Sequence, residues 1–175
     1  TEASYWTTTE DIQTYLNGRY PLLGGNIDGP NLGYLGADIR SDNMASSEYV
    51  NYLNGEEPTT APAGVGEGGW DFRDIRAINI FFDNYHKCQD PFDRYKHYVG
   101  EALFLRAYLY FAKVRRYGDV PWYNSQVFPN DPDLYKPRDK RSLVVDSIIA
   151  NLDRAIQYLK TRSEVGVNRI NKETA

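Results

Sequence analysis

Cysteine is almost absent from this sequence, because Cys88 is the only one among 175 residues. No disulfide can form within the chain, which excludes the small secreted folds that depend on disulfides. The sequence also lacks any apolar run close to the roughly 20 residues that a membrane-spanning helix needs. Its polar first residues do not resemble a signal peptide, so we expect any export signal or membrane anchor to lie upstream of residue 1.

An excess of positive charge is also missing. The net charge is -4 and the basic residues are scattered, whereas a protein that binds nucleic acid needs a concentrated positive field. The hydrophobic fraction of 41% and the charged fraction of 25% are typical of globular chains. Because 175 residues are enough for one hydrophobic core, we expect a single folded domain over residues 1–175. The scattered charge leads us to expect no nucleic-acid partner.

The sequence has none of the common patterns of catalytic or metal sites. His86, Cys88 and His97 could be drawn as metal ligands, but no fourth ligand has suitable spacing. There is no Gly-x-Ser-x-Gly motif, and the glycine-rich residues 64–69 follow no predicted strand, so a phosphate-binding loop is not indicated. We therefore predict no catalytic residue, no metal and no cofactor, and a protein that is not an enzyme.

Aromatic residues, in contrast, are abundant, with 15 Tyr, 7 Phe and 3 Trp making up 14% of the chain. Tyr and Trp combine an apolar ring with a polar group, which suits the recognition of sugars through stacking and hydrogen bonds. The alternative is that these rings pack at helix interfaces with their polar tips in water. Only aromatic residues that cluster in loops are therefore candidates for binding.

Apolar residues recur at helical spacing in four segments, which predicts helices at about 8–20, 70–87, 91–117 and 142–161. The third helix has apolar residues on more than one face, so we expect it to be buried on more than one side. The predicted fold is mostly α, with tetratricopeptide-like helix pairs and long irregular loops. The predicted core positions on the last three helices include Ile75, Ile78, Asn79, Phe82, Val99, Ala102, Leu103, Ala107, Tyr110, Phe111, Val114, Val145, Ile148, Ile149, Leu152, Ala155 and Leu159.

Residues that favour helix starts precede three of these segments. Thr7 and Glu10 have the spacing of a capping box, and Ser142 is placed to cap the last helix. Asp71 and Asp74 favour the start of the second helix through the helix dipole. Their position at a helix start favours ionised carboxylates and therefore capping over acid–base catalysis.

The region 22–69 is rich in Gly, Pro, Asn and Asp and has no sustained period, apart from a possible short helix at about 46–53. A loop of this length in a folded domain usually carries function. It leads directly into an indole, and it supplies hydrogen-bonding groups that could lie close to that ring. The candidate ligand-binding residues are Tyr34, Arg40, Asp42, Asn43 and Trp70.

Two interpretations of these aromatic residues stay open. Trp70 could stack on a ligand, or it could pack as a hydrophobic staple on the second helix. Trp122 and Tyr123 form another aromatic pair in a loop, and they could contact a ligand or a partner protein.

One helix carries a motif with a specific resemblance. Residues 101–107 read Glu-Ala-Leu-Phe-Leu-Arg-Ala, Tyr110-Phe111 follow, and residues 117–121 read Tyr-Gly-Asp-Val-Pro. This resembles the SusD/RagB family, whose signature is a Glu-Ala-x-Phe-Leu-Arg-Ala helix closed by an aromatic-Gly-x-Val-Pro stop. Flanking residues are also similar, so the resemblance extends from about residue 8 to 172.

The motif positions have physical roles that are structural. Gly100 allows another backbone to approach, and Gly118 with Pro121 directs the chain out of the helix. Glu101 and Arg106 are five residues apart and do not face each other, so we expect each to have a separate partner.

The resemblance implies the N-terminal helical part of a longer, lipid-anchored protein at the outer-membrane surface of a Gram-negative bacterium. It implies a nutrient-binding protein that delivers an oligosaccharide or a peptide to a SusC-type TonB-dependent transporter. The resemblance would also place the lipid anchor upstream of this sequence. A helical-repeat scaffold that binds only other proteins is the alternative from a different class.

Overall fold

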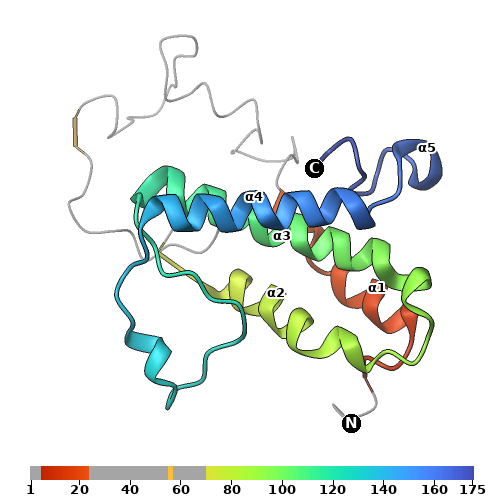
Figure 1. Ribbon diagram of the computed structural model, residues 1–175, viewed down its shortest axis with the longest axis horizontal. Helices are drawn as coiled ribbons and strands as arrows, with labels where there is room; N and C mark the ends of the chain where they lie inside the picture. Colours follow the sequence, from red (N-terminus) through yellow and green to blue (C-terminus); the bar gives the residue numbers. More distant parts are fainter. Residues whose placement is uncertain (1–4, 24–54, 57–69) are drawn as a thin grey trace.

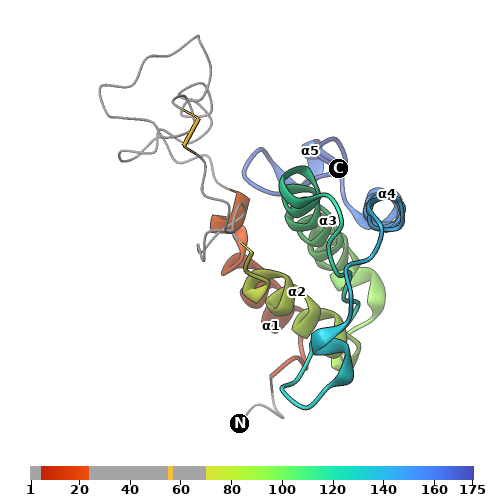
Figure 2. The ribbon, with the colours of Figure 1, turned by 90° about the vertical axis from the view of Figure 1, so that its left-hand side faces the viewer.

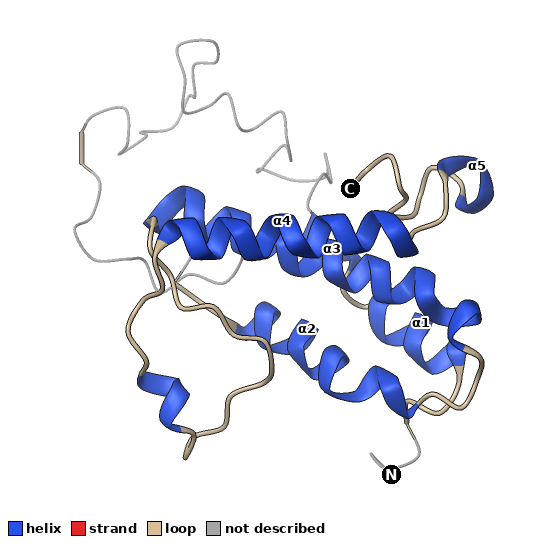
Figure 3. Cartoon of the chain, viewed as in Figure 1, coloured by secondary structure: helices blue, strands red, loops and turns tan. Residues whose placement is uncertain are grey.

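The computed structural model describes residues 5–23, 55–56 and 70–175, where α-helices alternate with loops and short 3-10 helices (Figures 1 and 3). The α-helices are α1 (Thr9–Asn17), α2 (Arg73–Asn84), α3 (Phe92–Tyr117), α4 (Arg141–Tyr158) and α5 (Arg162–Val165). The 3-10 helices are η2 (Tyr20–Leu23), η5 (Tyr85–Lys87) and η6 (Pro132–Tyr135). Within the described residues the β-type pairing is limited to an isolated bridge between Val120 and Asp139. The predicted mostly α fold is therefore confirmed.

The described part of the chain contains no helix with the length and apolar character that crossing a membrane requires. The predicted short helix at about 46–53 lies outside the described residues, as does nearly all of the predicted irregular region 24–69.

Helix α3 is the centre of the fold, as its apolar residues on more than one face predicted. Helix α4 runs antiparallel to it along one side, and α1 and α2 pack against another side (Figures 1 and 2). Most side chains of α3 between Val99 and Val114 are therefore buried, on most sides of the helix. Successive helices α2, α3 and α4 reverse direction at each connection, which gives the predicted helix pairs.

The predicted apolar stripes were wrong at several positions. Phe111 on α3 is 54% exposed. On α4, Ile149 is 51% exposed and Val145 is 36% exposed. On α4 the buried positions start at Val144 and continue with Ile148 and further residues at helical spacing. Helix α4 lies on the outside of the helix layers and has one face against α3, so its apolar stripe is broader than the surface it buries. A corresponding shift on α2 buries Phe81 completely and leaves Phe82 half-buried, packed against the core.

Asp71 and Asp74 lie at the start of α2 as predicted, with the Asp71 carboxylate accepting the N–H of Arg73 at 2.9 Å. The predicted caps of the first and last helices are displaced along the chain. Helix α1 is capped by Thr8, whose hydroxyl accepts the backbone N–H of Asp11, while the Asp11 carboxylate accepts the N–H of Thr8 at 3.0 Å. The capping box therefore begins one residue after the predicted Thr7–Glu10 pair. The Asp11 carboxylate also accepts the N–H of Thr7, so it forms hydrogen bonds with the backbone amides of both residues that precede the helix.

Helix α4 is not capped by Ser142, contrary to the prediction. It begins at Arg141, whose N–H donates to the carboxylate of Asp119 at 2.8 Å. Asp119 follows the end of α3, so a residue from the preceding loop places a negative charge at the N-terminus of α4. A tertiary contact of this kind has no signature in the local sequence.

The two ends of the loop from Gly118 to Lys140 are held together by hydrogen bonds. Gly118 ends α3 with φ of 70°, a left-handed conformation that glycine adopts without strain, and its N–H donates to Val114. The Asp139 carboxylate accepts the N–H of Trp122 at 2.7 Å, next to the bridge between Val120 and Asp139. The loop therefore leaves and rejoins the helices at one place, and its middle part extends beside α2 (Figure 1).

Candidate functional site

A cavity of about 560 Å³ lies between the start of α2 and the loop that joins α3 to α4. Three of its lining residues are aromatic, namely Trp70, Phe72 and Tyr123. Five are charged, namely Asp71, Arg73, Arg76, Lys136 and Arg138. The remaining ones are mostly apolar, which matches the usual composition of a small-ligand site.

Trp70 is half-buried and contacts two aromatic rings and one cation. Its ring makes T-shaped contacts with Phe72, at 5.3 Å between centroids, and with Tyr117, at 5.0 Å. The guanidinium carbon of Arg138 lies 4.5 Å from the centre of the indole. Trp70 thus links the residue segment before α2 to the end of α3, and the same side chain lines the cavity.

Tyr123 forms another part of the cavity wall and is held by buried polar groups. Its N–H donates to the Tyr110 hydroxyl at 2.7 Å, and its carbonyl accepts the amide of Asn79 at 2.9 Å. The Asn79 amide also donates to the carbonyl of Ser125. Lys136 lies over the Tyr123 ring, with Nζ 5.0 Å from its centre. Asn79 was predicted only as part of an apolar stripe, yet it fixes this wall to α2.

The acidic groups at the cavity are already engaged. The carboxylate of Asp71 contacts the Arg73 guanidinium at 2.6 Å, and this hydrogen-bonded partner lowers the pKa of Asp71. Asp139 accepts the backbone N–H of Trp122, which is the main reason that its pKa is lowered, and it pairs with Lys136 at 2.9 Å. Both carboxylates are therefore ionised at neutral pH and serve to position cations and backbone.

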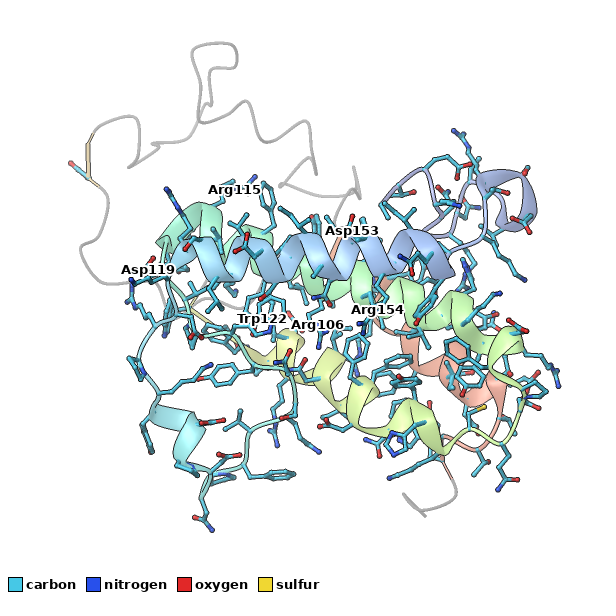
Figure 4. All side chains as sticks on the ribbon, in the orientation of Figure 1. Arg106, Arg115, Asp119, Trp122, Asp153 and Arg154 are labelled. Carbon is cyan, nitrogen blue, oxygen red and sulfur yellow. The ribbon has the colours of Figure 1, made fainter. Side chains whose placement is uncertain are left out.

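Trp122 and Tyr123 are neighbours in sequence but line different cavities. Trp122 is 7% exposed, its ring centroid lies 4.1 Å from that of Tyr110, and its indole N–H donates to Asn124. It lines a second cavity of about 360 Å³ together with Arg106 (Figure 4). The predicted pair is therefore not a single aromatic surface.

Arg106 is buried without a carboxylate partner among the described residues. Its Nε and Nη2 donate to the Asn151 amide oxygen at 3.0 and 2.7 Å, and its guanidinium stacks over Phe82 at 4.1 Å. Burial lowers the pKa of Arg106 to about 10, so it stays protonated at neutral pH. Because its contacts reach α2, α4 and the Asn124 carbonyl of the loop, this cation joins three parts of the fold.

Glu101 has partners from two other segments and a neighbour on its own helix. Its carboxylate accepts bonds from Arg169 at 2.7 and 2.9 Å and from the Tyr20 hydroxyl at 2.8 Å. His97 Nε2 lies 3.0 Å from it, at an angle that does not meet hydrogen-bond geometry. Burial raises the pKa of Glu101, but His97 and Arg169 outweigh this and leave the pKa below its usual value. Glu101 and Arg106 thus contact separate groups, and neither lines the cavity at Trp70.

Gly100 lies where α3 meets the end of α4. A Cβ at this position would stand 2.9 Å from Leu159 Cγ and 3.2 Å from the Leu159 backbone nitrogen. The close approach expected from the sequence is therefore present.

The structure brings one of the predicted ligand-binding residues, Trp70, to a cavity. Tyr34, Arg40, Asp42 and Asn43 lie outside the described residues. The sequence interpretation missed Arg76, Lys136 and Arg138, although Lys136 and Arg138 flank a proline in a loop, a pattern that could have indicated them. Across the described ranges no three His, Cys, Asp or Glu side chains are grouped to hold a metal ion, and His97 Nδ1 accepts the N–H of Lys160.

Comparison with known proteins gives a consistent result. A family model described as "SusD-like_3: Starch-binding associating with outer membrane" matches residues 8–175. The chain is 34% identical over 62 residues to SusD-like protein P38 of Formosa agariphila, a match that covers 35% of this chain and 12% of that protein.

Solved structures have the same fold. A SusD-like protein of Bacteroides fragilis superposes with a TM-score of 0.76 and 22% identity over 98% of this chain and 34% of its own length. A SusD-like carbohydrate binding protein of the same species gives 0.72 and 14%, over 96% of this chain and 35% of its own. One from Bacteroides vulgatus gives 0.66 and 22%, over 96% of this chain and 39% of its own. The chain thus spans between 34% and 39% of the length of these solved relatives.

Proposed function

Because this chain belongs to the SusD-like family of starch-binding proteins associated with the outer membrane, we propose that it is the N-terminal helical part of a cell-surface glycan-binding protein. In this proposal the full-length protein is held at the outer membrane by a lipid anchor upstream of residue 1. It captures an oligosaccharide and passes it to a SusC-type TonB-dependent transporter. It performs no chemistry on its ligand.

The observation that supports this proposal is the aromatic cavity at Trp70. Rings of Trp70, Phe72 and Tyr123 line one space, and the amide of Asn79 holds the wall that contains Tyr123. Sugars present apolar C–H faces bordered by hydroxyl groups, and aromatic rings with nearby polar groups are suited to both. The cavity is large enough, at about 560 Å³, for part of an oligosaccharide.

Substitution of Trp70 by alanine in the full-length protein tests the proposal. We expect affinity for the glycan to fall by about 1–3 kcal/mol, or about 5- to 150-fold in Kd, because an aromatic residue at the centre of a site acts through local contacts. A glycan panel in affinity gels identifies the ligand, and calorimetry of wild type and Trp70→Ala then measures the loss. Thermal melts of the same samples give the effect on stability.

Tyr135→Ala is the matched control, because Tyr135 is an aromatic residue of the same region that is 84% exposed and does not line the cavity. Its removal should leave both affinity and melting temperature unchanged. The contacts of Trp70 with Phe72 and Tyr117 also contribute to stability, so a modest decrease in melting temperature is expected for Trp70→Ala. A large decrease in melting temperature with unchanged affinity per folded molecule would show that Trp70 is only a packing residue.

A further inference from the structure

The cavity at Trp70 concentrates positive charge in a chain that is acidic as a whole. Four of its lining residues are cationic and one is anionic, whereas the net charge of the chain is -4. The anionic residue, Asp71, is paired with Arg73. Lys136 is paired with Asp139. The local excess of cations is therefore not balanced by the acidic groups of the cavity.

Two of these cations, Arg76 and Arg138, have no carboxylate within ion-pair distance in the part of the chain that the structure describes. Both side chains belong to exposed residues that line the cavity, one on α2 and one on the loop that joins α3 to α4. A guanidinium presents five N–H groups in a plane, and a carboxylate or sulfate is the group that matches this fork in a bidentate manner. The two side chains, which come from different segments but line one cavity, can thus both contact one anionic group.

The aromatic faces of the cavity point to the same ligand chemistry. Arg138 covers a face of Trp70 at 4.5 Å, and Lys136 lies over Tyr123 at 5.0 Å. A neutral sugar that stacked on the covered face would have to displace a cation from a favourable contact with the ring. A guanidinium that stays stacked on the indole still directs its N–H edge outward, where it can bind an anion.

We propose that the ligand of this cavity is an anionic oligosaccharide, in which a uronate carboxylate or a sulfate ester binds Arg76 and Arg138. This inference rests on the proposed glycan-binding function and adds the charge of the ligand to it. Trp70 and Tyr123 then hold Arg138 and Lys136 in place through cation–π contacts. The parts of the two rings that these cations do not cover contact the sugar.

Pairs of polysaccharides that share a backbone and differ in whether it carries the anionic group test this inference on the full-length protein. Polygalacturonate is compared with its methyl ester, and dextran sulfate with dextran, by affinity gel and by titration at fixed salt. The charged member of at least one pair should bind more tightly by about tenfold or more, the effect of a charge-assisted hydrogen bond. The pair that responds distinguishes a carboxylate from a sulfate ligand.

The double variant Arg76→Gln/Arg138→Gln should lose this advantage, whereas Arg115→Gln/Arg162→Gln should keep it. The control also removes two exposed charges, but Arg115 and Arg162 do not line the cavity. A loss of affinity in both double variants would indicate non-specific attraction of a polyanion and would overturn the inference.

The failures of the two proposals are distinguishable. If uncharged members bind as tightly as charged ones, and Trp70→Ala weakens both while Arg76→Gln/Arg138→Gln weakens neither, the ligand is a neutral glycan. In that case the anionic inference is wrong and the proposed function stands. If no polysaccharide binds and Trp70→Ala has no effect in the wider glycan panel, both proposals are refuted.

Discussion

Replacement of Gly100 by alanine tests how closely α3 and α4 pack. In the interior of an exposed helix this substitution stabilises a protein by about 0.5–1 kcal/mol, because glycine has the greater conformational freedom in the unfolded chain. At Gly100 the added Cβ would lie 2.9 Å from Leu159 Cγ, a distance too short for two carbon atoms. Something must move for the alanine to be accommodated.

The neighbour of Gly100 cannot move easily. Leu159 is 6% exposed, and its backbone nitrogen, which would lie 3.2 Å from the added Cβ, donates its hydrogen to the carbonyl of Ala155 at 2.8 Å. Extra atoms in a packed contact cost about 1–3 kcal/mol. After the gain in helix propensity is subtracted, Gly100→Ala should destabilise the protein by about 1 kcal/mol, or about 2–4 °C in melting temperature for a chain of this size.

Urea unfolding and thermal melts of Gly100→Ala and Gly18→Ala provide the assay and its control. Gly18 has φ of -66°, and a Cβ there would meet only the Tyr15 carbonyl at 3.5 Å, an ordinary contact. Gly18→Ala should therefore be neutral or slightly stabilising. In a double-mutant cycle, Leu159→Ala should relieve the cost of Gly100→Ala by about 1 kcal/mol. Stabilisation by Gly100→Ala, as at an unconstrained helix position, would refute the proposed close contact.

Two other substitutions test the core and its ionic contacts. Leu103→Ala should cost about 2–5 kcal/mol in free energy of unfolding, because Leu103 is 3% exposed, and a loss below about 1 kcal/mol in urea melts would contradict tight packing there. The lowered pKa of Glu101 means that its stabilising effect is present above its unfolded pKa of about 4.3 and is lost as the pH falls through its folded value. Glu101→Gln should therefore cost on the order of 2 kcal/mol at pH 7 and less as the pH falls below about 4, and a cost that does not change with pH in thermal melts would argue against the Arg169 pair.

Local sequence patterns were sufficient for the helices and for the end of α3. Apolar spacing located four helices to within a few residues, because each helix satisfies its backbone hydrogen bonds internally and needs only one apolar face. The stop at Gly118 was also predictable, because a helix often ends at a residue with positive φ and glycine adopts this conformation most easily. The motif around Glu101 and Arg106 identified the family before any contact of these residues was known.

Patterns within one segment could not give the partners of those residues or the amount of surface each helix buries. Glu101 binds Arg169, which lies 68 residues later, and the cap of α4 comes from Asp119 in the preceding loop. Phe111 and Ile149 have helical spacing typical of core positions and are nevertheless exposed. Which side of a broad apolar helix is buried depends on how many neighbours pack against it.

The sequence alone therefore determined that this is a helical SusD-like chain in which an indole precedes the second helix. The tertiary structure decided that Trp70 shares a cavity with Tyr123 and that Arg76 of α2 and Arg138 of the loop after α3 line this same cavity. Helix formation depends on contacts between residues three or four positions apart, which the sequence displays directly. The site depends on contacts between α2 and the loop after α3, whose relative positions are set by the packing of both against the central helix.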